Sequence, residues 1–108
     1  MQRIARLAKI RAGVEAEYDR HHAAVWPEVL AAISESGIRN YSIFRHGTWL
    51  FSYFELDDAI SMDEVTRVLS ENEACGRWEV MMDKLRDTTP EVTGLDCWQF
   101  IPEVFHID

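Results

Sequence analysis

The fold class is decided by the stretch IRNYSIFRHGTWLFSYFEL, residues 38–56. Its two ends, Ile38–Arg45 and Trp49–Leu56, are predicted strands, and His46-Gly47-Thr48 between them is a glycine-containing hairpin loop. The second strand is apolar on both faces, with Trp49, Phe51 and Tyr53 on one side and Leu50, Phe54 and Leu56 on the other. Such a strand needs cover on both faces. Helices can cover one face, so the pattern predicts a homodimer in which a second subunit covers the other.

Before this hairpin, the sequence predicts a strand and then a helical segment. Arg3–Ile10 alternates as a strand does. From about residue 14 to residue 36 the period is helical, with one face formed by Val14, Tyr18, His22, Val25, Val29 and Ile33. Pro27 lacks a backbone donor and clashes with the preceding turn, so we expect a kink or a break there. We expect Gly37 to end the segment in a left-handed cap.

After the hairpin, Ser61-Met62-Asp63-Glu64 has the pattern of a capping box and predicts the start of one or two helices that reach about Arg86. Thr88–Gly94 is expected to be a loop. Cys97–Ile107 is a predicted last strand, and Pro102 within it indicates an edge position or a bulge. The order is therefore βαββαβ, an α+β ferredoxin-like arrangement in which helices cover one face of a four-stranded antiparallel sheet.

Composition limits the classes of function. The chain has 108 residues without repeats or linkers, so we expect one domain over residues 1–108. A net charge of -8 argues against nucleic-acid partners and against anionic membrane surfaces. The charged start MQRIARLAKI and the lack of a long apolar run predict a cytoplasmic protein. Cys75 and Cys97 show no CxxC spacing, and we expect both thiols to be reduced.

Tyr18 and His22 are the first candidates for chemistry. They are four residues apart in the apolar stripe, so they are neighbours on the helix face that is turned to the sheet. Histidine titrates near neutral pH and a tyrosine hydroxyl can donate or accept, so the two residues could form an acid–base pair. The alternative, which the spacing alone favours, is a core histidine bonded to a carbonyl beside a space-filling tyrosine.

Other candidates lie in the predicted strand Ile38–Arg45 and in the last helical segment. Tyr41 is either a sheet aromatic with its hydroxyl at the rim or a pocket wall that donates a hydrogen bond. Asn40 takes the opposite face unless the strand is bulged. Trp78 could pack on a sugar, with Arg77 and Glu79 binding hydroxyls. The spacing alone favours a core tryptophan beside a surface charge pair.

Metal and cofactor chemistry find no support in the sequence. His21 and His22 are adjacent, so they point in different directions on a helix and form a poor chelate. No HExxH pattern, glycine-rich phosphate loop or GxSxG is present. We therefore expect no metal site and no cofactor.

Several of these residues fall into motifs of a known family. EYDRHHAAVWPE, residues 17–28, resembles the E-Y-x-x-x-H-x-x-x-W-P-E stretch of the L-rhamnose mutarotase family. The resemblance continues with Gly37, with NYSIF at residues 40–44, with CGRW at residues 75–78 and with EVFH at residues 103–106. These matches run nearly end to end and keep their order.

The resemblance implies a ferredoxin-like dimer, a dimeric α/β barrel, which works without metal or cofactor. It implies that His22 donates the proton and that Tyr18 and Tyr41 contact the substrate; Asn40, beside Tyr41, is a further candidate for substrate binding. The family packs two adjacent tryptophans on the sugar. Trp78 matches the first, but Glu79 stands in place of the second.

The predicted function is therefore the interconversion of the α and β anomers of a 6-deoxy-L-hexose by acid–base ring opening. L-rhamnose has an axial hydroxyl at C2 and an equatorial one at C4, and L-fucose has the reverse. A carboxylate in place of a flat apolar wall changes which hydroxyls are favoured, which puts L-fucose slightly ahead. Two alternatives remain: a cofactor-free monooxygenase on the same dimeric barrel, and a sugar-binding domain without catalysis.

Overall fold

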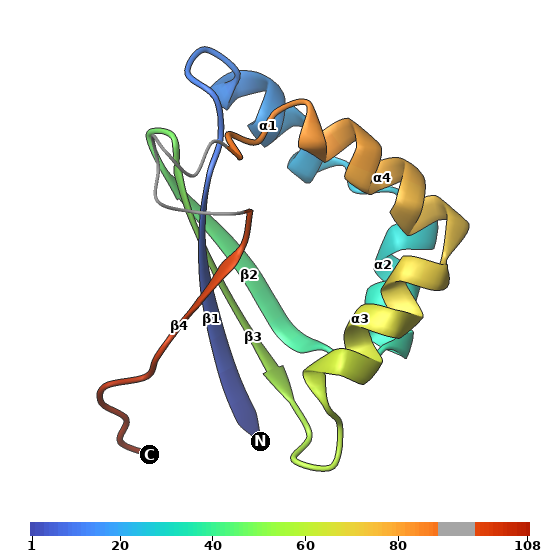
Figure 1. Cartoon of the computed structure of the whole chain (residues 1–108), viewed down its shortest axis with the longest axis vertical. Helices are drawn as coiled ribbons and strands as arrows, with labels where there is room; N and C mark the ends of the chain where they lie inside the picture. Colours follow the sequence, from blue (N-terminus) through green and yellow to red (C-terminus); the bar gives the residue numbers. More distant parts are fainter. Residues whose placement is uncertain (89–96) are drawn as a thin grey trace.

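A computed structural model describes residues 1–88 and 97–108 of the chain (Figure 1). The described strands form one antiparallel sheet in the order β2-β3-β1-β4, and they comprise β1 (Gln2–Lys9), β2 (Arg39–His46), β3 (Trp49–Leu56) and β4 (Gln99–Ile101). The described helices are α1 (Glu15–Ala23), α2 (Pro27–Glu35), α3 (Met62–Glu71) and α4 (Glu73–Asp83). Each helical segment of the βαββαβ order is divided in two. The α+β ferredoxin-like prediction is confirmed.

The first helical segment breaks where the proline predicts. Helix α1 ends at Ala23, and α2 begins at Pro27, the first helical position, where a missing N–H costs nothing. Gly37 follows the end of α2 with a φ of 99°. A Cβ atom at this position would lie 2.6 Å from Ile60 Cδ1. The left-handed conformation therefore favours glycine, and a larger residue would also displace the end of the Ile60 side chain.

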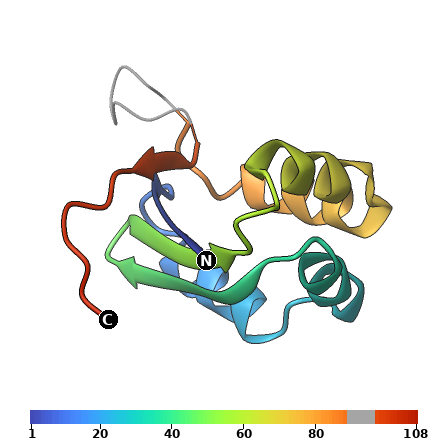
Figure 2. The ribbon, with the colours of Figure 1, turned by 90° about the horizontal axis from the view of Figure 1, so that it is seen from below.

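Two side-chain caps define the second helical segment. Ser61 Oγ accepts a hydrogen bond from the Glu64 backbone N–H at 3.1 Å and starts α3, as the capping box predicts. Asn72 ends α3, and its side-chain oxygen accepts from the Cys75 N–H at 3.0 Å to start α4. Figure 2 shows α3 and α4 side by side, with α2 beside them.

The last strand is shorter than expected. The prediction of a strand over Cys97–Ile107 is wrong, because only Gln99–Ile101 pairs, with β1 alone, at the edge of the sheet. Pro102 has no N–H to continue the ladder, and Cys97 has a left-handed φ of 69°, which bends the chain before the strand. Most of the predicted loop Thr88–Gly94 lies outside the described residues.

The helices gather on one side of the sheet (Figure 1). On that side β3 buries Leu50, Ser52, Phe54 and Leu56, whereas Phe51 on its other side is 44% exposed. Phe51 is paired with Phe44 of β2, which is 63% exposed. The sheet thus has one covered face and one apolar face open to solvent. Within residues 1–88 and 97–108, no helix is long and apolar enough to cross a membrane.

Candidate active site

A cavity of about 480 Å³ lies between the covered face of the sheet and the helices. Its size is in the range of small-molecule sites. The predicted site residues Tyr18, His22, Tyr41, Trp78 and Glu79 all line it. Most of its other lining residues are apolar. The fold therefore gathers candidates from three separate parts of the sequence around one space.

Asn40 is the predicted site residue that the structure does not bring to this cavity. The register of β2 shifts between Arg39 and Ser42, and Asn40 there has a left-handed φ of 52°. Its side-chain amide donates a hydrogen bond to the Glu55 carboxylate instead. The bulge that sequence reasoning left open is thus present, but the role of Asn40 in substrate binding gains no support from the geometry.

The backbone of α1 determines how His22 is held. His22 Nδ1 lies 3.0 Å from the carbonyl oxygen of Tyr18. A carbonyl can only accept, so Nδ1 carries the hydrogen and Nε2 keeps a free lone pair. The two rings also stack, with centroids 4.1 Å apart and planes inclined by 24°. The bond to a carbonyl, expected for a core histidine, therefore coexists with a place on the cavity wall.

Burial sets the protonation of this pair. It lowers the pKa of His22 below its usual value, and the nearby charge of Arg86 lowers it further, against the opposing effect of the hydrogen bond to Tyr18. The ring is therefore neutral at pH 7. Burial also raises the pKa of Tyr18 far above its usual value. Its hydroxyl stays protonated and can donate a hydrogen bond.

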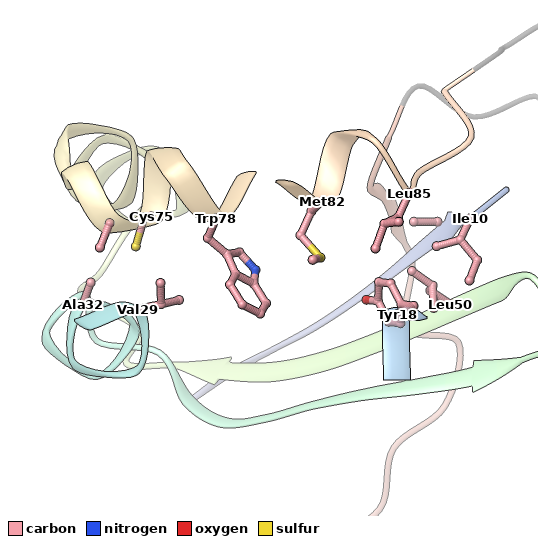
Figure 3. Packing of buried hydrophobic residues seen from close by; sticks show 11 residues of the cluster. Ile10, Tyr18, Val29, Ala32, Leu50, Cys75, Trp78, Met82 and Leu85 are labelled. Atoms are coloured by element: carbon pink, nitrogen blue, oxygen red, sulfur yellow. The ribbon is translucent and has the colours of Figure 1, made fainter. Parts of the chain in front are cut away.

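Trp78 of α4 packs against aromatic rings of α1 and of the residue before α2. Its side chain is 7% exposed and projects from α4 toward the strands, as does Met82, with Tyr18 facing them from α1 (Figure 3). Its ring meets those of His22 and Trp26 edge to face, with centroids at 5.5 Å and 5.2 Å. Such pairs add to the stability that apolar burial provides. Trp78 is thus both a core residue and a wall of the cavity.

Glu79 is tied to a residue that sequence reasoning missed. Arg86 is buried, and its Nη1 and Nη2 donate to the two carboxylate oxygens of Glu79 at 2.7 Å and 3.2 Å. Burial lowers the pKa of Arg86, but the hydrogen bonds and charge of Glu79 outweigh this effect and raise it. Helical spacing does not explain this contact, because α4 ends at Asp83 and Arg86 forms an isolated β-bridge with Ile10.

Arg6 is the second residue that sequence reasoning missed. It lines the cavity from β1, and its Nη2 donates to the Tyr41 hydroxyl oxygen at 2.9 Å. The signal in the sequence was a charged residue at an inward position, between Ile4 and Ala8, in an alternating strand.

Acid–base chemistry is what these groups can perform. A neutral imidazole with a free nitrogen, protonated tyrosine hydroxyls and a guanidinium surround a largely apolar cavity. Among residues 1–88 and 97–108, no three His, Cys, Asp or Glu side chains are grouped to hold a metal ion. The fold and the cavity thus define a class: a small α+β enzyme equipped for proton transfer.

Comparison with known proteins identifies the family. The family model described as L-rhamnose mutarotase matches residues 3–107. An L-rhamnose mutarotase of Opitutus terrae is 33% identical over 110 residues and covers all of both chains. One of Ligilactobacillus salivarius is 38% identical over 98 residues, which is 85% of this chain and 84% of that protein. The chain belongs to the L-rhamnose mutarotase family.

A solved structure supports the fold. The crystal structure of an L-rhamnose mutarotase from Formosa agariphila aligns with a TM-score of 0.78 over the whole of both chains, at 23% identity. The resemblance of the sequence motifs to this family is confirmed, and the chain is an isomerase of the mutarotase type. The monooxygenase and the non-catalytic domain receive no support from these matches.

The lowered pKa of His22 predicts how stability depends on pH. His22 binds a proton more tightly in the unfolded chain than in the folded one. The contribution of neutral His22 to the free energy of unfolding is therefore complete above about pH 6.5 and is lost as the pH falls toward the pKa of the folded state. In an NMR titration, the histidine signal that disappears in His22→Gln should have its midpoint below 6.5. Urea unfolding should show a weaker pH dependence just below pH 6.5 in that variant. A midpoint at or above 6.5 would contradict the prediction.

Proposed function

We propose that this enzyme interconverts the α and β anomers of a 6-deoxy-L-hexose, with His22 as the principal acid–base group. The observation that carries the proposal is the hydrogen bond from His22 Nδ1 to the Tyr18 carbonyl, which leaves Nε2 as the only free basic nitrogen of the ring. Burial keeps that nitrogen unprotonated at neutral pH. A general base of this kind matches the proton that anomer exchange has to remove.

Ring opening needs two proton transfers. His22 Nε2 takes the proton of the anomeric hydroxyl, a second group protonates the ring oxygen, and the bond between C1 and the ring oxygen breaks to give the open aldehyde. Rotation about C1–C2 and closure with the reverse transfers give the other anomer. Each positioned group typically contributes about 10²- to 10⁴-fold to the rate.

The remaining cavity residues would hold the sugar. Tyr18 lies beneath His22 and can donate its hydroxyl hydrogen, so it acts as the partner of His22 or as an anchor for the sugar. Trp78 offers a ring to the apolar side of the sugar, and Tyr41 offers a hydroxyl from the sheet. The apolar lining suits a methyl group at C5, which is the mark of a 6-deoxy sugar.

The choice between L-rhamnose and L-fucose depends on Glu79. The named relatives are L-rhamnose mutarotases, which supports L-rhamnose. Glu79 lines the cavity with a carboxylate bonded to Arg86, so a charged pair stands where the family has a second tryptophan. A charged pair favours the binding of a sugar whose hydroxyls can form hydrogen bonds with it, and a flat apolar wall does not, which supports L-fucose.

Replacement of His22 tests the mechanism. We expect His22→Ala to lose anomer exchange almost completely, because no other residue offers a free neutral imidazole at that place. Saturation-transfer proton NMR on equilibrated L-rhamnose and L-fucose measures the exchange directly, and circular dichroism verifies the fold. The control is His21→Ala, since His21 does not line the cavity. Turnover near the wild-type level in His22→Ala would disprove the assignment.

Replacement of Glu79 tests sugar selection. We expect Glu79→Trp to move the ratio of exchange rates toward L-rhamnose, because it restores a flat apolar wall. Glu79→Gln is the matched control, since it keeps the size and a hydrogen-bond acceptor for Arg86 but removes the charge. The same NMR measurement reports both sugars. An unchanged preference in Glu79→Trp would show that Glu79 takes no part in selection.

We also propose that the enzyme is a homodimer joined through the open face of the sheet. Phe44 and Phe51 lie exposed side by side on that face. The segment after β4 adds further exposed apolar side chains, Val104, Phe105 and Ile107. An exposed apolar patch of this kind marks an interaction surface. A second copy of the chain, carrying the same patch, is a self-complementary partner.

The oligomeric state tests this surface. We expect sedimentation of a dimer at micromolar concentration, and a shift to monomer in Phe51→Glu, because a carboxylate would be desolvated in the interface. Leu30→Glu is the control, since Leu30 is an exposed apolar residue on α2, in the helical layer. A wild-type monomer, or an equal effect of both substitutions, would contradict the proposal.

A cytoplasmic location is proposed from the cysteines. Cys75 is buried in α4, Cys97 is half-buried before β4, and both are free thiols. Free thiols persist in reducing compartments.

A further inference from the structure

Arg6 is a charged side chain at an inward position of the central strand β1. The alternation of the strand places it on the same face as Ile4 and Ala8, which pack into the core. A guanidinium in such a position costs free energy unless its charge is paired or its hydrogens are bonded. Its surroundings therefore have to compensate for its burial.

Two hydroxyls and two aromatic rings hold this guanidinium. Nη2 donates to the Tyr41 hydroxyl oxygen at 2.9 Å, and Nε donates to Ser52 Oγ at 3.2 Å. The central carbon lies 5.0 Å from the ring centre of Phe54 and 4.7 Å from that of Trp98. Within the described part of the chain, no carboxylate forms an ion pair with Arg6. Its positive charge is left to act on the oxygens that it touches.

On the cavity wall, this charge acts on the hydroxyl oxygen of Tyr41. Its hydroxyl accepts from Arg6, so its own hydrogen has to point elsewhere, and no described residue accepts it. Burial raises the pKa of Tyr41, while the charges of Arg6 and Arg86 act in the opposite direction and favour the phenolate. Tyr41 is thus a proton donor whose conjugate base would already have a cation bonded to it.

We propose that Tyr41 is the second proton-transfer group of anomer exchange, and that Arg6 is a positioning residue that orients its hydroxyl and stabilises its phenolate. The proposal rests on the proposed function, because it assigns the group that works from the sheet while His22 works from α1. Both residues line the same cavity.

The proton transfers balance over one cycle. On opening, the proton of the anomeric hydroxyl passes to His22 Nε2 and its electron pair forms the C1 carbonyl. The bond between C1 and the ring oxygen breaks, and the ring oxygen takes the proton of the Tyr41 hydroxyl. The enzyme then holds an imidazolium and a phenolate bonded to Arg6. On closure, the proton of the sugar hydroxyl returns to Tyr41 and that of His22 returns to the anomeric oxygen.

The test follows mutarotation by polarimetry from a freshly dissolved single anomer of L-rhamnose or L-fucose, over a range of concentrations. We expect Tyr41→Phe to lower kcat by about 10²-fold or more. We expect Arg6→Met to lower kcat by about 10- to 10³-fold, with KM within about threefold of the wild type. The double variant should be no slower than Tyr41→Phe, because Arg6 acts through the hydroxyl that is missing.

Two further variants separate catalysis from folding. Arg6→Lys keeps the positive charge and should recover part of the kcat that Arg6→Met loses, a rescue that a purely structural role does not predict. Should Arg6→Met unfold in circular dichroism, Tyr41→Phe and Arg6→Lys carry the test. Arg67→Met is the control, because Arg67 forms its ion pairs with Glu64 and Glu71 on the exposed side of α3.

Three results would overturn the proposal: wild-type kcat in Tyr41→Phe or Arg6→Met, losses that multiply in the double variant, or a rise of KM alone in Arg6→Met, which would place Arg6 directly on the sugar. A wild-type protein that does not exceed the uncatalysed rate would instead refute the proposed function itself. The two failures are therefore distinguishable in one set of measurements.

Discussion

The pairing of β1 with β3 is the interaction on which the rest of the structure depends. The register runs without interruption from Gln2 opposite Leu56 to Lys9 opposite Trp49. Because side chains alternate along a strand, this register decides which residues face the helices. It places Arg6 opposite Ser52, so that both lie on the inner face. A slip of one residue would turn either Arg6 or Ser52 to the opposite face of the sheet and break the hydrogen bond between them.

The helices complete the cavity because each of the two helical segments is broken into two short helices. The break before Pro27 and the cap at Asn72 let α1, α2, α3 and α4 lie over the sheet at different angles. Two buried clusters hold the layers together, one around Leu50 and Met82 and the other around Phe54 and Val65. The cavity borders on both clusters, so a packed core and an open site share the same walls.

Several polar groups that line the cavity are held by local partners. The Tyr18 carbonyl orients His22, the Tyr41 hydroxyl accepts from Arg6, and Glu79 binds Arg86. Burial favours the neutral imidazole of His22 and strengthens the hydrogen bond between Arg6 and Tyr41. The groups are therefore held in position before a substrate enters, and such preorganisation would lower the reorganisation that the proposed proton transfer requires.

Local sequence determined the elements: the hairpin around Gly47, the break at Pro27, the cap at Ser61 and the helix face that joins Tyr18 to His22 all follow from residue-by-residue rules, and their order determined the fold class. The sequence also named five residues that line the cavity, but only the tertiary structure decided how they are brought together and which further residues join them. Arg6 and Tyr41 are far apart along the chain and meet only through the sheet register, and the bulge at Asn40 turned that residue to Glu55. Strand β4 ends early at Ile101, because Pro102 has no N–H with which to extend the pairing with β1. Periodicity reports which face of an element is apolar, but contacts between elements depend on register and packing, which only the folded chain contains.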